Sequence, residues 1–279
     1  MKKHFISTSA QWLCALFCLF CLLGITACAT TRGAADTSSI VGKWFFDYRD
    51  NQDSSTVQIF DFKADGTITG YLRNQDTYEY DKGTYWFEED GTGKPVFVIN
   101  FTQSKLNPQD SFEECDLKTY YNIEITDDDL VLTRFKRDFT AMGGDIQTFD
   151  PPAVLHFYRM KNVKAKQLTG TWSLVSSPEL FQTFGKDGTF MTVSMSGKYP
   201  MGTFELIQKD NATGLRLDLT QFKDTLSEEP REIPDTNEYF YDMWLAHDMF
   251  LIQMQTGAII GDSEYNNYPE VYSVLTLEQ

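Results

Sequence analysis

The sequence predicts an all-β fold: two tandem up-and-down antiparallel β-barrels that follow an export signal. Three observations lead to this prediction. Short runs of aromatic and β-branched residues are separated by turn residues at about every 8 to 15 positions, without sustained helical periodicity. The motif Gly-x-Trp occurs twice, ending at Trp44 and at Trp172, and each copy opens a unit of roughly 120 residues. The first residues combine positive charge with an apolar run.

The composition allows packed cores and argues against nucleic-acid binding. Of the 279 residues, 42% are hydrophobic and 15% are aromatic, which is enough to bury the interior of two small domains. Without the expected signal, 22 Lys and Arg remain against 40 Asp and Glu, a net charge of −18. No basic patch is visible, so we expect no nucleic-acid partner.

Residues 1–27 are predicted to be a lipoprotein signal peptide. Lys2 and Lys3 precede an apolar stretch that is short for a transmembrane helix of about 20 residues. The following Ile-Thr-Ala-Cys sequence resembles the bacterial lipobox, in which cleavage precedes a cysteine that receives diacylglycerol. Cys28 is therefore the expected lipidation site, and the small and polar residues 28–39 are the expected tether. Ala29 in place of an aspartate favours the outer membrane within the cell envelope.

The first unit, residues 40–160, is expected to contain eight strands. Aromatic and β-branched positions alternate with polar ones, as a half-buried strand requires. The predicted strands cover residues 42–46, 57–62, 67–72, 78–87, 95–101, 119–125, 130–135 and 153–159.

The second unit, residues 161–279, repeats landmarks of the first in the same order. The offset between the copies drifts slowly from 128 to 117 residues, as expected for a duplication with small deletions. The paired landmarks are Trp44 with Trp172, Asp65-Gly66-Thr67 with Asp187-Gly188-Thr189, Gly83 with Gly202, Thr102-Gln103 with Thr220-Gln221, Leu130 with Met249, and Phe157 with Val274.

The loop lengths predict that one end of each barrel carries the variable connections. Asp-Gly marks a tight hairpin turn because glycine accepts a positive φ without steric cost. The even-numbered connections of the first unit are short, whereas the odd-numbered ones at 47–56, 103–118 and 136–152 are longer. In an up-and-down barrel all odd connections share one end, and loops gathered on a rigid scaffold are where binding usually occurs.

The ordered set of Gly-x-Trp, Asp-Gly-Thr, Gly-Thr-aromatic and Asp-x-x-Leu resembles lipocalin-like domains of bacterial lipoproteins, over nearly the whole chain after the signal. The resemblance implies that Trp44 plugs the closed end of the first barrel under a basic side chain from the last strand, a role that Arg159 is placed to fill. Residues 271–279 contain no Arg or Lys, so the plug at Trp172 is expected to be apolar.

The sequence predicts no enzyme activity, cofactor or metal site. His156 and His247 lack a partner motif, and the carboxylates around Cys115 would raise the pKa of its thiol. The run Asp127-Asp128-Asp129 lacks the alternation of a calcium loop and is expected to be a solvated turn.

The aromatic side chains predict a binder of small apolar or amphipathic ligands, held without catalysis inside the barrels. An eight-stranded barrel is just wide enough either to be filled by side chains or to hold one small ligand. The alternative is a surface or periplasmic interaction protein with solid barrels, whose loops contact an envelope or host protein. The interior candidates are Phe60, Phe62, Tyr85, Phe87, Phe97, Ile99, Tyr121 and Phe157 in the first unit, and Phe184, Phe204, Leu217, Phe240 and Trp244 in the second.

Overall fold

The computed structural model describes residues 39–46, 56–75, 77–193, 196–235 and 237–278. Its secondary structure is 67% strand and 4% helix, which confirms the all-β class. The predicted signal peptide and Cys28 lie outside the described residues. Within the described part of the chain, no helix has the length and apolar character needed to cross a bilayer.

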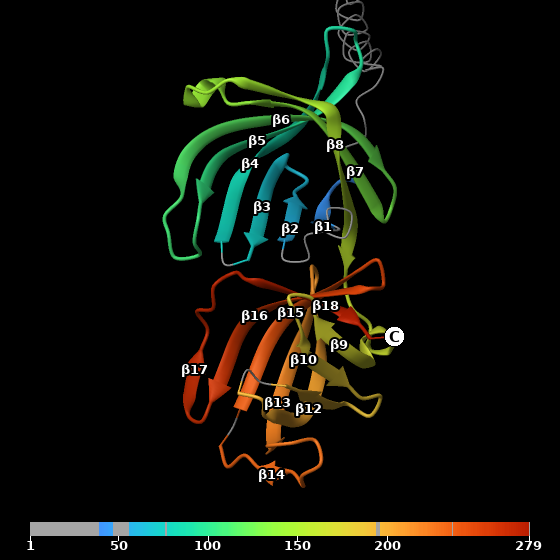
Figure 1. Cartoon of the computed structure of the whole chain (residues 1–279), viewed down its shortest axis with the longest axis vertical. Coiled ribbons are helices and arrows are strands. Elements are labelled where there is room, and N and C mark those ends of the chain that lie inside the picture. Colours follow the sequence, from blue (N-terminus) through green and yellow to red (C-terminus); the bar gives the residue numbers. More distant parts are fainter. Residues whose placement is uncertain (1–38, 47–55, 76, 194–195, 236, 279) are drawn as a thin grey trace, which may run out of the picture. The chain divides into compact units, whose positions relative to one another are not determined.

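Strands β1 to β8 form a closed eight-stranded antiparallel barrel (Figure 1). Each strand pairs with the next, and β8 also pairs with β1, which closes the ring. The strands are β1 (Gly42–Phe46), β2 (Thr56–Phe62), β3 (Thr67–Asn74), β4 (Thr77–Glu89), β5 (Pro95–Lys105), β6 (Glu113–Ile125), β7 (Asp129–Asp138) and β8 (Ile146–Lys161).

All eight expected strands of the first unit are present, and all but β1 are longer than predicted. The β5–β6 connection covers only residues 106–112 and the β7–β8 connection only residues 139–145, where the 3₁₀ helix η3 (Thr140–Met142) lies. The expected loops at 103–118 and 136–152 are therefore mostly strand. We call these two extended hairpins, residues 103–118 and 136–152, the hairpin arms. The sequence did not reveal their strands because polar residues occupy both faces of the arms, which removes the alternation that identifies a strand.

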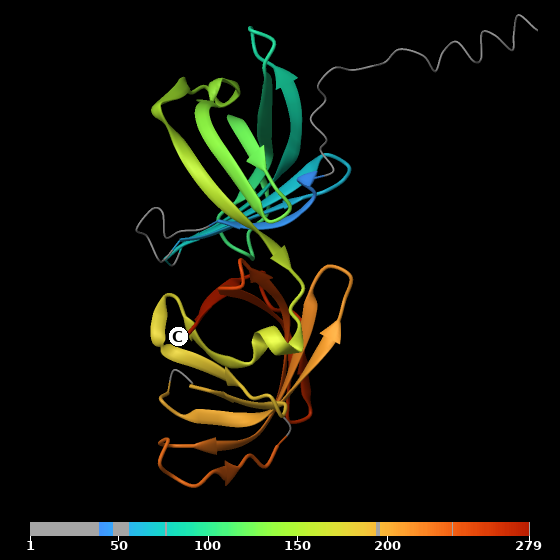
Figure 2. The same cartoon turned by 90° about the vertical axis from the view of Figure 1, so that its right-hand side faces the viewer.

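The remaining strands also pair in a ring, in which β18 returns to β9 (Figure 2). The short helix α2 (Ala165–Leu168) precedes β9, and two small strands, β14 and β17, lie alongside β13 and β16. The strands are β9 (Gly170–Leu174), β10 (Ser177–Phe184), β11 (Thr189–Thr192), β12 (Tyr199–Gln208), β13 (Thr213–Lys223), β14 (Arg231–Glu232), β15 (Asn237–Ala246), β16 (Phe250–Ile260), β17 (Ser263–Tyr265) and β18 (Tyr272–Leu277).

The two Gly-x-Trp motifs have the same local geometry. The indole nitrogen of Trp44 donates a hydrogen bond to the Ile40 carbonyl at 2.7 Å, and that of Trp172 donates to the Leu168 carbonyl at 2.7 Å. Both indoles are buried, so each N–H needs an internal acceptor. In both copies the carbonyl four residues earlier fulfils this requirement.

The Asp-Gly turns also recur with the same hydrogen bonds. The Asp65 carboxylate accepts bonds from the backbone N–H and the hydroxyl of Thr67, and Asp187 accepts the same two bonds from Thr189. Gly66 and Gly188 both have φ of +83°, which is the left-handed conformation that glycine adopts without strain. The turn prediction is confirmed in both places.

A β-bulge recurs at Gly83 and Gly202, where the register shifts between β4 and β5 and between β12 and β13. A Cβ on Gly83 would lie 1.9 Å from the Asn100 carbonyl oxygen, and one on Gly202 would lie 1.8 Å from that of Asp218. The bare backbone at these glycines is required by the close approach of the neighbouring strand.

The last two predicted repeat landmarks are displaced. Trp44 is opposite Arg159 and Trp172 is opposite Leu277, so Arg159 and Leu277 are equivalent positions. Two residues earlier on the same strands, Phe157 is therefore equivalent to Leu275. Their partners on the neighbouring strands, Leu130 and Leu251, are then equivalent as well. The sequence offsets had matched Leu130 with Met249 and Phe157 with Val274. The difference arises because hydrophobic residues occupy both faces of β16 and β18, so the pattern does not reveal which set points inward.

Both faces of β15, β16 and β18 are buried because the two rings pack within one compact unit, Thr37–Gln279. The second ring has its own core cluster around Trp172, Phe184 and Leu251. The outward residues of its three strands belong instead to the core cluster of the first barrel, and they include Trp244, Ala246, Phe250, Ile252, Tyr272 and Val274.

Candidate functional site

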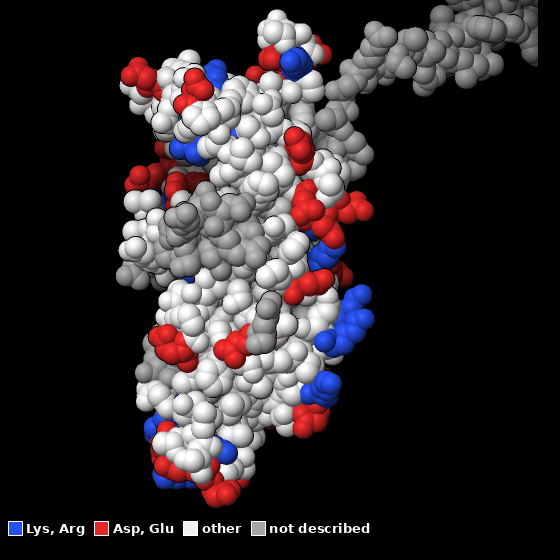
Figure 3. Space-filling view, turned by 45° about the vertical axis from the view of Figure 1, so that its right-hand side comes forward, with Lys and Arg blue, Asp and Glu red and all other residues white. Residues whose placement is uncertain are grey.

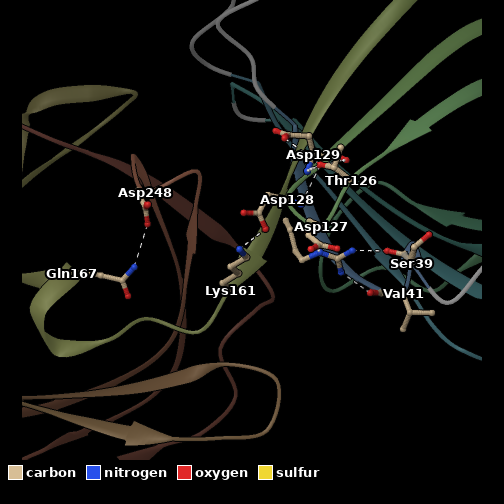
Figure 4. Close-up of polar contacts among 10 residues, drawn as sticks. Ser39, Val41, Thr126, Asp127, Asp128, Asp129, Lys161, Gln167 and Asp248 are labelled. Carbon is tan, nitrogen blue, oxygen red and sulfur yellow. Dashed lines mark hydrogen bonds and ion pairs between the residues drawn. The ribbon is translucent and has the colours of Figure 1, made fainter.

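Arg159 lies over the indole of Trp44 at one end of the first barrel. Its guanidinium carbon is 4.1 Å from the ring centroid, within the range of a cation–π interaction. The same guanidinium donates hydrogen bonds to the backbone carbonyls of Ser39, Val41 and Asp127 (Figure 4). The contact joins the last strand of the barrel to its first, because Arg159 on β8 is opposite Trp44 on β1.

The turn at residues 126–129 helps to hold that arginine. The Thr126 hydroxyl accepts the backbone N–H of Asp129 at 3.0 Å, and the Asp128 carbonyl accepts the N–H of Arg159 at 2.8 Å. Asp128 also forms an ion pair with Lys161 (Figure 4). Among the described residues no group of three His, Cys, Asp or Glu side chains is arranged to hold a metal ion.

The interior of the first barrel beside Trp44 is filled with aromatic rings. Phe60 stacks on Phe157 with centroids 5.1 Å apart, and Phe62 meets Tyr85 edge to face at 5.0 Å. Phe97 lies within 6.4 Å of the rings of Phe62, Tyr85, Phe87 and Tyr121. Seven of the eight interior candidates of this unit are buried and Phe87 is half-buried, so this part of the barrel is a packed core.

The second ring contains a cavity of about 550 Å³, a size typical of small-molecule sites. The residues that line it come from one end of the ring, the end of the connections β9–β10, β13–β15 and β16–β18. Its walls are Leu174, Leu180, Phe181, Gln182, Thr192, Val193, Tyr241, Gln253, Gln255, Tyr268, Pro269, Val271, Ser273 and Leu275.

The cavity is lined by apolar and uncharged polar side chains in equal number, and by no charged side chain. Gln253 is buried, and its amide donates to the Gln182 side-chain oxygen at 2.9 Å. Burial raises the pKa of Tyr241 to about 12, so its hydroxyl stays neutral at ordinary pH. Such a lining can accept an uncharged apolar molecule and orient it with one or two hydrogen bonds.

The second-unit candidates divide between two faces. Phe184 and Leu217 are buried in the core of the second ring, and Phe204 packs against it. Phe240 and Trp244 do not face this interior. On β15 the residues opposite Leu215 and Leu217 are Tyr241 and Tyr239, so odd-numbered positions point inward and even-numbered ones outward. The assignment of Phe240 and Trp244 to the interior was therefore wrong by one position.

Most of the cavity lining was missed from the sequence. Gln182, Gln253 and Ser273 are polar, and a polar residue in a strand pattern is normally assigned to the solvent face. Tyr268 and Val271 lie in the connection between β16 and β18, at the end of the ring where the sequence predicts the variable connections. The position of that loop was the one sequence feature that could have indicated the cavity, because the residue types of the loop do not identify it as a lining.

Two of the residues considered for catalysis, His247 and Cys115, contact an aromatic ring and a backbone carbonyl, respectively. His247 lies in a turn with its ring 4.5 Å from that of Tyr158. The Cys115 thiol donates to the Phe101 carbonyl at 3.3 Å, and burial together with Asp81 and Asp116 raises its pKa. A raised pKa lowers the thiolate fraction that a nucleophile requires.

On the face in Figure 3 the basic side chains lie in small separate groups among acidic and uncharged ones. The chain matches no protein-family model, and comparison with curated proteins gives no match. The case for a function therefore rests on the geometry of the two rings.

Proposed function

We propose that this protein is a cell-envelope lipoprotein that binds a small apolar or amphipathic molecule without catalysis, inside the second of two tandem lipocalin-like barrels. The single observation that supports the binding role is the uncharged cavity at the loop end of the second ring. Residues 40–160 and 161–279 would be the two barrels. The repeated tryptophan bonds, Asp-Gly turns and glycine bulges support a common origin for them.

The binding role is tested by native mass spectrometry of the mature protein with oleyl alcohol, a monoacylglycerol, oleate and haem. We expect retention of an uncharged amphiphile, because the lining offers hydrogen bonds but no charge. Ser273→Trp places an indole in the cavity and should abolish retention. Ile207→Trp is the matched control, since Ile207 is 42% exposed, belongs to the same ring and is outside the lining. Absence of any retained molecule in the wild type would rule out the binding role.

The lipid anchor is a separate part of the proposal. Cys28 would carry a diacylglycerol, and together with an acylated amino terminus this exceeds the single chain that binds membranes only weakly. Cys28→Ala should move the protein from the membrane fraction to the soluble fraction and stop incorporation of labelled palmitate. Cys115→Ala should change neither. Equal palmitate incorporation into the Cys28 variant would exclude this site.

A second candidate function is favoured by the packed aromatic interior of the first barrel. In this alternative the first barrel is a solid scaffold, and its long hairpin arms contact an envelope or host protein. The arms expose apolar side chains, with Leu106 66% exposed and Ile146 51% exposed. Cleavage in these arms by a protease added to whole cells would show that they are displayed. Protection of the arms in intact cells would exclude a host partner.

A further inference from the structure

Arg134 and Arg137 both face the interior of the first barrel. They lie opposite Tyr121 and Thr119, which are 4% and 3% exposed, and a β-bulge in β7 separates the two pairs. The extra residue of the bulge brings two positions three apart onto the same face. Below them on the same strand, the inward positions are Leu130 and Leu132, both fully buried.

In the part of the chain that the structure describes, neither guanidinium group is paired directly with a carboxylate. The Nε atoms of Arg134 and Arg137 are covered from solvent and make no hydrogen bond, and within the described residues neither side chain forms an ion pair. Burial and the neighbouring charge of Arg137 lower the pKa of Arg134. Each guanidinium instead lies over a ring, with the Arg134 carbon 4.3 Å from the Phe149 centroid and the Arg137 carbon 5.9 Å from that of Phe139. Two adjacent cations without a counter-ion are costly in a protein interior.

The acidic groups on the same inward face are Glu79 and Asp81 on β4, together with Glu113 on β6, which is opposite Ser104, the partner of Asp81. Asp81 is opposite Gly70, which is opposite Phe60, so it shares the inward face, and Glu79 two positions earlier does too. Burial and the charge of Glu79 raise the pKa of Asp81 to about 7. The charge of Arg137 acts in the opposite direction and favours the ionised form of Asp81.

We infer that Arg134 and Arg137 form an anion-binding site inside the first barrel, which takes the carboxylate or phosphate group of a ligand. Guanidinium groups bind such planar or tetrahedral oxyanions through paired N–H donors. Both side chains are half-buried, so their terminal nitrogens are accessible while the Nε atoms are covered. This site goes beyond the proposed function, because it lies in the other ring and differs in charge from the uncharged cavity.

The test is calorimetric titration of the mature full-length protein with oleate, oleyl alcohol, acetate and inorganic phosphate. We expect oleate or phosphate to bind, and Arg134→Gln with Arg137→Gln to weaken that binding by about tenfold or more, since each variant removes charge-assisted hydrogen bonds. Lys136→Gln is the matched control, because Lys136 is opposite Tyr120 on the outer face. Binding of oleate alone would identify a lipid head group, and binding of acetate or phosphate a free anion; either result supports the site.

Two further measurements distinguish the arginine site from the cavity of the second ring and from a loss of folding. Oleyl alcohol should bind the arginine variants as well as the wild type, so a loss of anion binding alone assigns the anion to the arginines. Arg134→Lys with Arg137→Lys keeps the charges and should bind at an intermediate level, with an unchanged near-ultraviolet spectrum showing that the barrel is folded. Anion binding that is equal in wild type and both double variants, or absent from the wild type, would overturn the inference.

Discussion

Arg159 and Leu277 occupy equivalent positions with opposite chemistry. Each lies opposite the tryptophan of its own ring, and each crowds the glycine two residues before that tryptophan. A Cβ on Gly42 would lie 3.0 Å from the Arg159 guanidinium, and one on Gly170 would lie 2.9 Å from the Leu277 methyl. The first ring therefore covers its tryptophan with a cation, whereas the second ring has an apolar side chain at the equivalent position.

Arg159→Leu should lower the free energy of unfolding by about 1–3 kcal/mol. The change removes a cation–π contact and three bonds to carbonyls that can partly turn to water. Urea unfolding followed by tryptophan fluorescence measures the loss. Arg159→Lys should retain part of the stability, because an ammonium can lie over Trp44 but cannot bond all three carbonyls. A leucine variant as stable as the wild type would show that the first ring, like the second, does not need a cation beside its tryptophan.

Asp81 should make the protein less stable as the pH rises. Its carboxyl pKa is about 7 in the folded state, against about 4 in the unfolded chain, so the folded state binds the extra proton between these values. The free energy of unfolding should therefore fall from about pH 4 to about pH 7. Asp81→Asn should remove this contribution and be relatively more stable at pH 8 than at pH 5. The exposed Asp145→Asn serves as the control in the same urea titrations, and an identical pH slope in wild type and Asp81→Asn would contradict the assignment.

At the scale of elements, the bulges opposite Gly83 and Gly202 set where β5 and β13 bend, because the extra residue of each bulge lies in those strands. Each bulge follows directly after a strand position paired with a Gln, Gln103 in one ring and Gln221 in the other. Bulges sharpen the twist of a strand, which a small closed barrel requires at its corners. The bulge is therefore as much a repeated feature as the tryptophan.

Gly83→Ala should destabilise the protein by about 2–4 kcal/mol. Its Cβ would meet the Asn100 carbonyl oxygen at 1.9 Å, and neither partner is a flexible side chain that could move aside. Gly91→Ala is the control, since nothing lies within 4 Å of its Cβ position. Thermal unfolding followed by circular dichroism compares the two. Equal melting temperatures would show that the strands separate at the bulge more easily than the geometry indicates.

The sequence predicted the strands of the first unit better than their ends or faces. Alternation and Asp-Gly turns located all eight strands, because one face of each contacts a core. The hairpin arms at residues 103–118 and 136–152 were missed because polar residues occupy both of their faces. Trp244 was assigned to the wrong face because both faces of β15 are buried, and Gln253 was overlooked because a polar residue in an interior can be recognised only from its partner, Gln182.

At the scale of the whole molecule, the two rings share apolar surface within one compact unit. Phe45 and Phe250 have ring centroids 5.0 Å apart, and Tyr71 meets Tyr272 at 4.8 Å. Lys43 lies 4.4 Å from the Trp244 centroid, where burial lowers its pKa. Strands β8 and β15 also pair directly. Rings joined in this way should unfold together.

A double-mutant cycle on Phe45 and Phe250 tests this coupling. Both phenylalanine side chains are fully buried, so each alanine variant alone should lower the free energy of unfolding by about 3–5 kcal/mol. Because the two side chains contact each other, the combined loss should differ from the sum by about 0.5–1.5 kcal/mol. Phe45→Ala with Phe190→Ala is the matched control, since Phe190 is equally large and buried but belongs to the separate core cluster of the second ring. Losses that add in the control and not in the contacting pair, with one calorimetric transition in the wild type, would establish that the second ring stabilises the first through this face. Additive losses in both pairs would mean that each ring is stable on its own.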